Sequence, residues 1–472
     1  MSETFFALLL NSHEAFLPHL KGENPTCYVQ PHYRKQLLMD QMVINSGDTA
    51  WMLASTGLVL LMTPGLAFFY GGMVRTKSVL NMMMMSMISM GVVSVLWVIY
   101  GFELSFGYKA DSPWYGSFSF SGLGGVVNDF TNNGGLYPIP VLVFAAFQLM
   151  FAIITPALIS GAIADRAKFT SWAVFVAIWS TLVYFPVAHW VFAFGNKVGD
   201  TVTGAGFLAS KGLEDFAGGT AVHINAGAAA LALTIVLGKR VGWRKESMRP
   251  HSLPLVMLGS GLLWFGWFGF NAGSALAANG IAALALINTQ VAAAAALAGW
   301  LLVEKIRQGH PTSLGAASGA VAGLVAITPA CAFVAPWAAV VIGFLAGILC
   351  SMATGLKYRF NLDDSLDVVG VHLIAGIWGS VAIGFFGASS VNSVGVDGLL
   401  YGGGIALLGK QAFGVAIVAV YSFIATLIIG YAIEKTIGFR IKREAEVAGI
   451  DLNEHAETAY EMTSSSRGGV IL

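Results

Sequence analysis

The sequence predicts an all-α polytopic membrane protein, because two properties of the chain exclude an ordinary soluble protein. Of its 472 residues, 56% are hydrophobic and only 11% are charged, whereas soluble domains contain about 25% charged residues. Apolar stretches of about 20 residues, the length of helix that crosses a bilayer, recur along the chain. No long polar or Pro-rich linker separates them, so we expect one membrane domain with a tail at each end.

Eleven apolar stretches are long enough for membrane-spanning helices. A bilayer core about 30 Å thick needs about 20 mostly apolar residues per crossing. The membrane domain is therefore expected over residues 48–434, between a polar N-terminal extension, 1–47, and a C-terminal tail, 435–472. The expected spans are 48–71, 79–104, 137–164, 170–192, 215–238, 253–276, 282–303, 314–334, 335–355, 366–390 and 412–434.

The basic residues predict the orientation of these spans. If the spans alternate in direction, 18 of the 25 Lys and Arg residues fall on one side, including those at 239–249 and 435–443. Basic loops are retained in the cytoplasm, so the N-terminus is expected outside and the C-terminal tail inside. We expect a multi-pass protein of the plasma or inner membrane.

Charge and cysteine content exclude several function classes. The formal net charge is zero, so nothing indicates a nucleic-acid surface. Cys27, Cys331 and Cys350 are too scattered for a disulfide framework or a thiolate metal site. The sequence carries no redox, hydrolytic or phosphate-binding motif, so we expect no cofactor, no metal and no enzymatic activity.

Two histidines occupy equivalent points of a sequence echo. Val222–Gly227 and Val371–Gly376 share the pattern Val-His-x-x-Ala-Gly. The two spans are an odd number of crossings apart and run in opposite directions, as in an inverted repeat. One such histidine alone is as readily a packing residue as a functional one. Two at the repeat interface, where transport sites lie, favour a pore lined by His223 and His372.

Three further polar residues have a simpler interpretation. Asp215 begins the fifth span and Asp367 the tenth. An aspartate there can cap the first-turn amides, which we favour, or lend negative potential to a cation. His189 lies near the end of the fourth span and has no mate in the repeat. We expect it to be structural.

Aromatic residues near the histidines suggest a cation site. Phe147 and Phe151 are four residues apart and share a helix face. Trp264–Ser274 adds further rings and a hydroxyl. Most aromatic residues in membrane helices only pack or anchor the interface. Ring faces also attract small cations, so an aromatic constriction beside a histidine pair would bind and dehydrate one.

At these segments the chain resembles the ammonium transporter family, the Amt/Mep branch of the Amt/Rh superfamily. The resemblance spans nearly all of residues 48–456. It implies an eleven-helix protomer built as a five-plus-five inverted repeat, with one pore in each subunit of a homotrimer. The segments that carry it are Pro64–Gly72, Phe147–Phe151, Asp215–His223, Gly266–Ser274 and Asp367–His372.

The resemblance also implies a role for each matching residue. The tail at 449–460 resembles the family's regulatory C-terminus, which makes a PII-type nitrogen signal protein an expected partner. The implied roles are an outer ammonium site at Phe147, Phe270 and Ser274, held together by Asp215, a stacked gate of Phe151 and Phe270, a pore lining at Trp267, and the histidine pair His223 and His372.

One position departs from the family pattern. Many members place a tryptophan over the cation site twelve residues before the position of Asp215, where this chain has Thr203. A cation–π contact of about 0.5–2 kcal/mol is then missing or comes from another ring, such as Phe207 or Trp190. The affinity of the outer site depends on which of the two applies.

These observations predict an ammonium transporter. A charge in a low-dielectric pore is costly, so the cation is expected to lose its proton and cross as ammonia, with the proton left outside or relayed by the histidines. Two alternatives stay open. An ammonium sensor of the same fold would need little flux, although the short tail disfavours it. A neutral ammonia or gas channel of the Rh type would keep the same residues.

Overall fold

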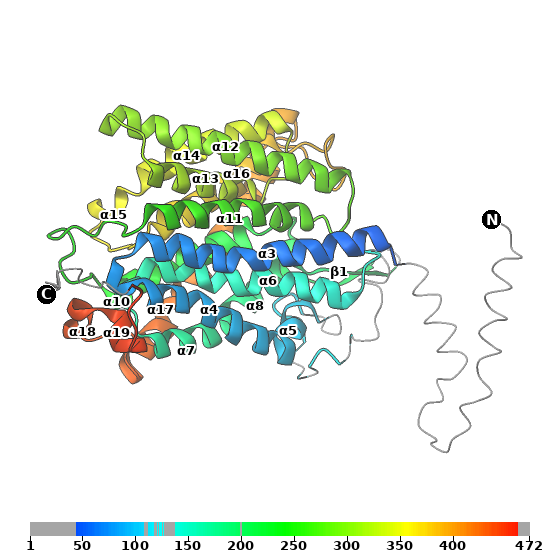
Figure 1. Cartoon of the computed structure of the whole chain (residues 1–472). Coiled ribbons are helices and arrows are strands. Elements are labelled where there is room, and N and C mark those ends of the chain that lie inside the picture. The colour runs from blue at the N-terminus through cyan, green and yellow to red at the C-terminus, as the bar shows by residue number, and fades with distance from the viewer. Residues whose placement is uncertain are drawn as a thin grey trace, which may run out of the picture. The chain divides into compact units, whose positions relative to one another are not determined.

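The computed structural model describes residues 44–107, 112–117, 120, 122–124, 126, 137–198 and 201–460. Most of the expected extension, 1–47, lies outside the described residues, and the first described helix, α3, begins at Ser46. The helices from α3 onward form one bundle (Figure 1). A short antiparallel hairpin of β1 and β2 is the sheet in the described part of the chain.

Ten helical segments of the described chain are long and apolar enough to cross a membrane, which confirms the expected all-α, multi-pass fold. The eighth expected span is the shorter helix α13, with 15 residues. It ends at Ile327 because the chain turns before Pro336 opens α14. The α-helices and strands are α3 (Ser46–Met73), α4 (Val79–Leu96), α5 (Phe102–Phe106), α6 (Val141–Ile159), α7 (Phe169–Trp179), α8 (Phe185–Phe192), β1 (Phe194–Val198), β2 (Thr201–Ala205), α9 (Phe207–Ser210), α10 (Asn225–Leu237), α11 (Leu253–Gly273), α12 (Gly280–Gln308), α13 (Ser313–Ile327), α14 (Pro336–Ala353), α15 (Leu356–Arg359), α16 (Ile374–Phe386), α17 (Ala406–Thr436), α18 (Arg443–Ala448) and α19 (Ile450–His455).

Small residues bring the helix backbones into close contact. A Cβ atom on Gly259 of α11 would lie 2.3 Å from the amide nitrogen of Phe69 on α3. A Cβ atom on Gly347 of α14 would lie 2.0 Å from the carbonyl oxygen of Ala296 on α12. Only glycine fits at either position. This is how membrane helices gain contact area without a hydrophobic force between them.

The α-helical path changes to π-helical turns at both copies of the Val-His-x-x-Ala-Gly pattern. The turn η6 (Gly219–Ile224) leads into α10, and η7 (Val369–Leu373) leads into α16. Both following helices have 13 residues. Turns of this kind are frequent at functional sites. The two sequence copies therefore share one local structure, with a histidine in each turn.

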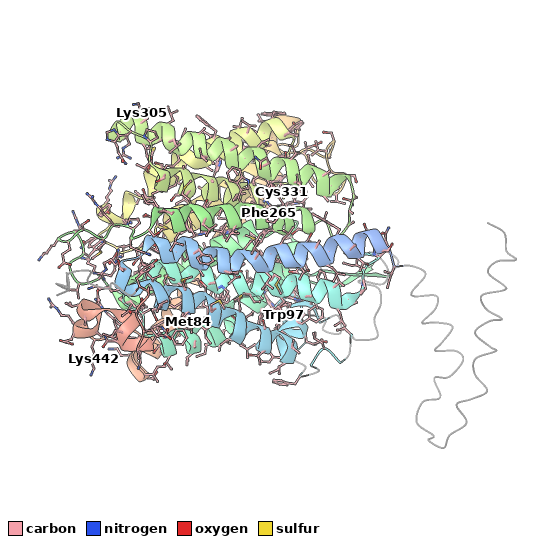
Figure 2. The ribbon with its side chains drawn as sticks, viewed as in Figure 1. Met84, Trp97, Phe265, Lys305, Cys331 and Lys442 are labelled. Atoms are coloured by element: carbon pink, nitrogen blue, oxygen red, sulfur yellow. The ribbon has the colours of Figure 1, made fainter. Side chains whose placement is uncertain are left out.

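One end of the bundle, here called the basic end, carries a buried network of ion pairs. Arg240 bonds Asp363 at 2.8 Å and Asp165 at 3.2 Å, and Arg75 bonds Asp165 at 3.0 Å. Arg166 donates to the carbonyl oxygen of Asp363 at 2.7 Å. Buried charges are costly unless they are paired, so this network fixes the loops that carry them. Lys305 and Lys442 lie at the same end (Figure 2).

The C-terminal tail packs against the basic end through α18 and α19 (Figure 1). The Asp451 carboxylate accepts hydrogen bonds from the backbone amides of Leu80 at 3.0 Å and Asn81 at 2.8 Å. Glu454 accepts from the amide of Phe169 at 2.8 Å. Amides in the first turn of a helix lack partners within the helix. The tail therefore supplies the N-terminal caps of α4 and α7.

Candidate functional site

The two predicted histidines meet inside the bundle. The Nδ1 atoms of His223 on η6 and His372 on η7 are 3.3 Å apart. The rings are nearly parallel, at 15°, with centroids 5.4 Å apart, and both side chains are buried. A hydrogen bond between two Nδ1 atoms needs one donor and one acceptor. One ring therefore carries its hydrogen on Nδ1, and the Nδ1 atom of the other ring accepts it. The Nε2 atom of His223 has no partner among the described residues.

A narrow cavity runs beside this pair. Its volume is ≈ 10 Å³, close to the minimum of about 10–15 Å³ that one water molecule requires. Trp267 stacks on His223 at 15°, with ring centroids 5.4 Å apart, and donates its indole hydrogen to Thr328. Apart from the histidines the lining is apolar, and it consists of Met62, Leu66, Phe69, Ile154, Leu158, His223, Leu263, Trp267, Phe270, Val321 and His372.

Two phenylalanine rings close one end of the cavity. Phe151 of α6 and Phe270 of α11 have centroids 4.2 Å apart at 31°, and both are almost completely buried. Phe147, one turn from Phe151, meets it edge to face at 5.0 Å. Phe270 lines the cavity and Phe151 lines a second pocket. The rings therefore separate two spaces, as the gate interpretation requires.

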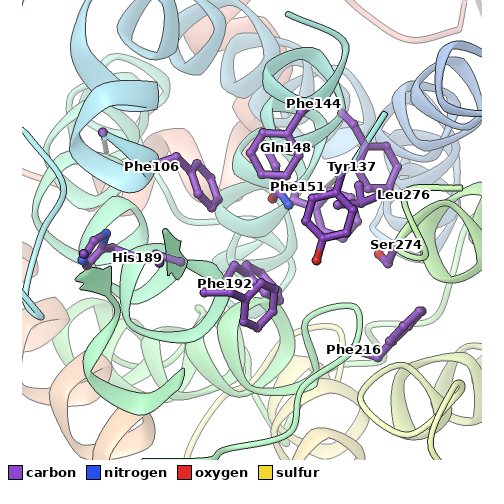
Figure 3. Close-up of a pocket in the computed structure, with 16 residues that line it drawn as sticks. Phe106, Tyr137, Phe144, Gln148, Phe151, His189, Phe192, Phe216, Ser274 and Leu276 are labelled. Atoms are coloured by element: carbon purple, nitrogen blue, oxygen red, sulfur yellow. The ribbon is translucent and has the colours of Figure 1, made fainter. Parts of the chain in front are cut away.

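The second pocket opens on the other side of these rings, at the end of the bundle opposite the basic end. Its volume is ≈ 60 Å³. Figure 3 shows aromatic rings on several sides of it, with the hydroxyls of Tyr137 and Ser274 among them. The lining residues are Phe106, Gly107, Tyr137, Phe144, Phe147, Gln148, Phe151, His189, Phe192, Ala193, Phe194, Gly195, Gly204, Phe216, Ser274 and Leu276. Phe147 and Ser274 thus share a pocket, whereas Phe270, which was expected to join them, is absent from its lining and borders the cavity beside the histidines.

Ser274 is oriented to accept a hydrogen bond from an occupant of this pocket. Its Oγ atom donates to the carbonyl oxygen of Phe270 at 2.8 Å. The hydroxyl hydrogen is thereby engaged, while the oxygen lone pairs stay free. A cation with N–H groups can therefore find both ring faces and an oxygen acceptor here.

Asp215 caps η6 and does not line the pocket. Its carboxylate accepts from the backbone amides of Gly218, Gly219, Thr220 and Ala221, at distances from 2.7 to 3.1 Å. Burial raises the pKa of this carboxyl, and the four amide hydrogen bonds oppose that effect. The cap interpretation is confirmed. Asp215 can therefore act on the pocket only through the loop that it holds.

The cap interpretation of Asp367 is wrong. The amides of Val368 and Val369 bond the carboxylate of Asp364 instead, at 3.1 and 2.8 Å. Asp367 adopts a left-handed backbone, with φ of 62°, and pairs with Lys357 at 2.7 Å. Burial raises the pKa of Asp364 to about 6, and the nearby charge of Asp367 adds to the shift. The residue that caps the start of η7 is therefore Asp364, three positions before Asp367.

The position of Thr203 has a structural explanation. Thr203 lies on β2, paired with Asn196 on β1, so counting back from Asp215 ends inside the hairpin. Phe192, the last residue of α8, lines the pocket instead. Phe207 and Trp190, the rings expected to substitute, are absent from the lining. Counting residues back from Asp215 does not lead to Phe192, because the hairpin lies between them.

His189 makes the structural contacts expected for it and also lines the pocket. Its Nδ1 atom lies 2.8 Å from the carbonyl oxygen of Ser105, and its Nε2 atom lies 3.0 Å from that of Ser112. The ring thus ties α8 to α5 and to the segment that follows it. Within the described ranges, no three His, Cys, Asp or Glu side chains gather closely enough to hold a metal ion.

Comparisons with known proteins agree with this geometry. Residues 50–460 match the model of the Ammonium Transporter Family. The chain is 54% identical to an ammonium transporter of Mycobacterium tuberculosis over 92% of this chain and 94% of that protein. An ammonium transporter of Bacillus subtilis is 46% identical, with 88% and 98% covered.

Solved structures give the same result. The crystal structure of Saccharomyces cerevisiae Mep2 superposes with a TM-score of 0.77 at 32% identity, over 85% of this chain and 91% of that one. A protein described as a sensor Amt protein superposes with a TM-score of 0.76 at 28% identity, over 89% and 99%. Taken with the family match over most of its length, these likenesses show that the chain belongs to the ammonium transporter family.

Proposed function

We propose that this protein takes up ammonium by binding the cation in the aromatic pocket and conducting ammonia past the histidine pair. The observation that carries this proposal is the order of the spaces: a pocket with ring faces and a hydroxyl, a closed pair of rings, then a narrow, largely apolar cavity beside two imidazoles. Ammonium transport itself is the activity named for the family and for the similar proteins.

The pocket supplies the binding step. Phe147 and Phe192 present aromatic rings, which attract a small cation. Ser274 offers an oxygen whose hydrogen is already engaged with Phe270. These groups replace part of the hydration shell of ammonium. Asp215 contributes by holding the loop that carries Phe216, another ring in the lining.

Deprotonation follows from the change of surroundings beyond Phe151 and Phe270. An unpaired charge in an apolar space costs far more than a neutral molecule of the same size. Ammonium removes that cost by giving up a proton, and potassium has none to give up. The closed rings and the apolar cavity therefore reject potassium although its charge and size resemble those of ammonium.

The histidine pair serves the neutral molecule and offers a path for the proton. The unpartnered Nε2 atom of His223 can form a hydrogen bond with ammonia in the cavity. The bond between the two Nδ1 atoms connects His223 to His372. If the proton crosses through this connection, transport carries current. If it stays outside, transport is electroneutral.

The arrangement in the membrane belongs to the same proposal. We place the pocket outside and the basic end in the cytoplasm, with the N-terminus outside and the tail, 435–472, inside. α13 then completes eleven crossings, which divide into a five-plus-five inverted repeat about η6 and η7. We further propose a homotrimer in the plasma or inner membrane, with the docked tail as the regulatory contact for a PII-type protein.

Current in proteoliposomes after an ammonium pulse tests the function. A potassium pulse and a double variant, His223→Ala with His372→Ala, complete the design, and His310→Ala is the matched control because His310 is exposed. An ammonium-specific current altered only by the double variant supports electrogenic transport. No current but a rise in internal pH supports electroneutral ammonia conduction or a neutral gas channel.

A sensor with little flux is the second candidate, since a neighbour of the same fold is described as a sensor Amt protein. In that case neither current nor internal pH would respond while ammonium still binds. Isothermal titration of ammonium into the purified protein separates this outcome from an inactive preparation. Binding without flux would overturn transport as the function.

A further inference from the structure

Glu214 is a buried carboxyl that the proposed transport steps do not use. It directly precedes Asp215 and is 9% exposed. Its Oε1 atom accepts a hydrogen bond from the backbone amide of Val396 at 2.8 Å. Its Oε2 atom is buried without a partner among the described residues. A half-satisfied buried carboxylate is costly, so its presence beside the pocket loop needs a reason.

The loop that carries Glu214 is clamped to the start of α17. The Gln411 side chain accepts from the Glu214 amide at 2.8 Å and donates to its carbonyl oxygen at 2.7 Å. The same nitrogen also donates to the carbonyl oxygen of Ser380 at 2.9 Å. A Cβ atom on Gly414 would lie 2.6 Å from the Leu213 side chain. These contacts therefore hold the backbone of Glu214 in place against α17.

Among the described residues, the charged groups that border Glu214 are one cation and two carboxylates. Lys410 lies beside the loop, since a Cβ atom on Gly212 would lie 3.0 Å from its Nζ atom. Asp397 follows Val396 and accepts from the amide of Ser389. Asp215 on the same loop is held by four amides. Burial raises the pKa of the Glu214 carboxyl to about 7, against the opposing effects of the Val396 amide and the Lys410 charge.

The same loop forms a wall of the pocket. Phe216, two residues after Glu214, lines the pocket, and its amide donates to the carbonyl oxygen of Pro329 at 3.1 Å. The charge on Glu214 is therefore carried by the segment that faces the proposed ammonium site. A negative charge near a partly closed site attracts cations into it.

We propose that Glu214 sets the ammonium affinity of the pocket by gaining and losing a proton. Ionised, it holds a negative charge behind the pocket wall and strengthens binding. Protonated, it leaves the wall neutral and weakens binding. Glu214 touches no substrate and acts through the field and the loop, so it is a positioning residue. The inference rests on the proposed function and adds to it a dependence of affinity on external pH.

The test compares the KM for ammonium uptake in proteoliposomes across about pH 5.5 to 8.5, a range that brackets neutrality. Glu214→Gln keeps the side-chain oxygen that faces Val396 and removes the charge. The matched control is Glu304→Gln, because Glu304 is also a buried glutamate but lies at the basic end. We expect Glu214→Gln to equal the wild type at the acid limit and to have a KM about threefold higher at the alkaline limit.

The ratio of the KM of the variant to the KM of the wild type separates the effect of Glu214 from other effects of pH on ammonium. A constant ratio at every pH would overturn the proposal, because a purely structural role does not titrate. Lys410→Gln gives an independent arm: the step in the ratio should move to higher pH. If the wild type takes up no ammonium at any pH, the proposed function fails instead.

Infrared spectroscopy tests the protonation without any ammonium. The difference spectrum between acid and neutral pH should contain a carboxylic acid carbonyl band that is lost in Glu214→Gln and kept in Glu304→Gln. If the two variants give the same titration as the wild type, Glu214 does not titrate in this range, and the inference is wrong.

Discussion

Phe151 and Phe270 lie with their ring centroids 4.2 Å apart, one ring lining the pocket and the other lining the cavity beside the histidines. Phe151→Ala removes one ring and joins the two spaces. Water then follows the cation inward, and the selectivity for ammonium over potassium is expected to fall about tenfold or more, or about 1.4 kcal/mol. The measurement is potassium current in proteoliposomes. Phe175→Ala is the control, because Phe175 is equally buried but lies on α7. Equal exclusion of potassium by both variants would contradict the gate.

The bond between His223 and His372 predicts a second effect. His372→Ala leaves the buried Nδ1 atom of His223 without its partner at 3.3 Å. Removing one partner of a buried hydrogen bond destabilises the folded protein by about 1–3 kcal/mol. The variant also lacks the proposed connection between the two imidazoles, so ammonium uptake is expected to fall at least about tenfold. Stopped-flow measurement of internal pH follows the uptake. Unchanged uptake in His372→Ala, beside an unchanged His310→Ala control, would show that the pair is only structural.

The position of Phe192 in the pocket lining predicts that a larger ring there raises the affinity for ammonium. It stands in the pocket lining where the family pattern, counted by spacing alone, led to Thr203. Tryptophan is the strongest aromatic partner for a cation, and an added 0.5–1 kcal/mol corresponds to an affinity about three times higher. Phe192→Trp should therefore lower the KM for ammonium, measured by uptake at fixed pH, whereas Phe192→Leu should raise it. A higher KM in both variants would mean that Phe192 supports the wall by shape alone.

The cap formed by Asp215 predicts that its removal lowers the stability of the folded protein. Asp215→Ala leaves four amides of η6 without their acceptor. Loss of an N-terminal cap costs about 0.5–2 kcal/mol, and buried amides add to that cost. Thermal unfolding in detergent should show a lower midpoint for Asp215→Ala than for the exposed control Glu457→Gln. Equal midpoints would remove the capping role.

The ion pairs at the basic end predict sensitivity to acid. Burial favours the protonated form of Asp363, but the hydrogen bond from Arg240 and the charges of Arg166 and Arg240 outweigh it and lower its pKa. A carboxyl with a lowered pKa in the folded state stabilises the fold above its unfolded pKa of about 3.9. That contribution is lost as the pH falls through the folded value.

Thermal midpoints at neutral pH and below about pH 4 measure this contribution. Asp363→Asn leaves the buried Arg240 with Asp165 as its remaining charged partner, and the loss of the charged hydrogen bonds to Asp363 is expected to cost about 1–3 kcal/mol at neutral pH. The wild type should lose more stability on acidification than the variant does. An equal loss in both would assign the acid sensitivity to other carboxyls.

Two contacts around the cavity could be predicted from the sequence because local patterns indicated them. His223 and His372 share a six-residue pattern, and Phe147 and Phe151 share a helix face, so both pairs meet in the structure. Such arguments depend only on the helical repeat and on the cost of polar groups at membrane depth. The number of long helices could be predicted in the same way, except where α13 stops early.

Other features depend on tertiary contacts that no local pattern contains. The β1–β2 hairpin shifts the spacing between Phe192 and Asp215, so counting residues led to Thr203. Asp364 and Asp367 both precede the tenth span, and only the packed backbone decides which one caps it. The contact between Glu214 and Gln411 joins residues 197 apart in the sequence. Such pairs follow from how helices pack, which composition and periodicity do not determine.

The cap of α4 has a consequence for the order in which the protein is made. The Leu80 amide finds its acceptor in Asp451, 371 residues later. While the ribosome is still adding the second half of the chain, the first turn of α4 has no such acceptor, and it gains one only when α19, which carries Asp451, has been made. A chain whose synthesis stops before Asp451 therefore leaves the Leu80 and Asn81 amides of α4 without their acceptor, however well the rest of the bundle has packed.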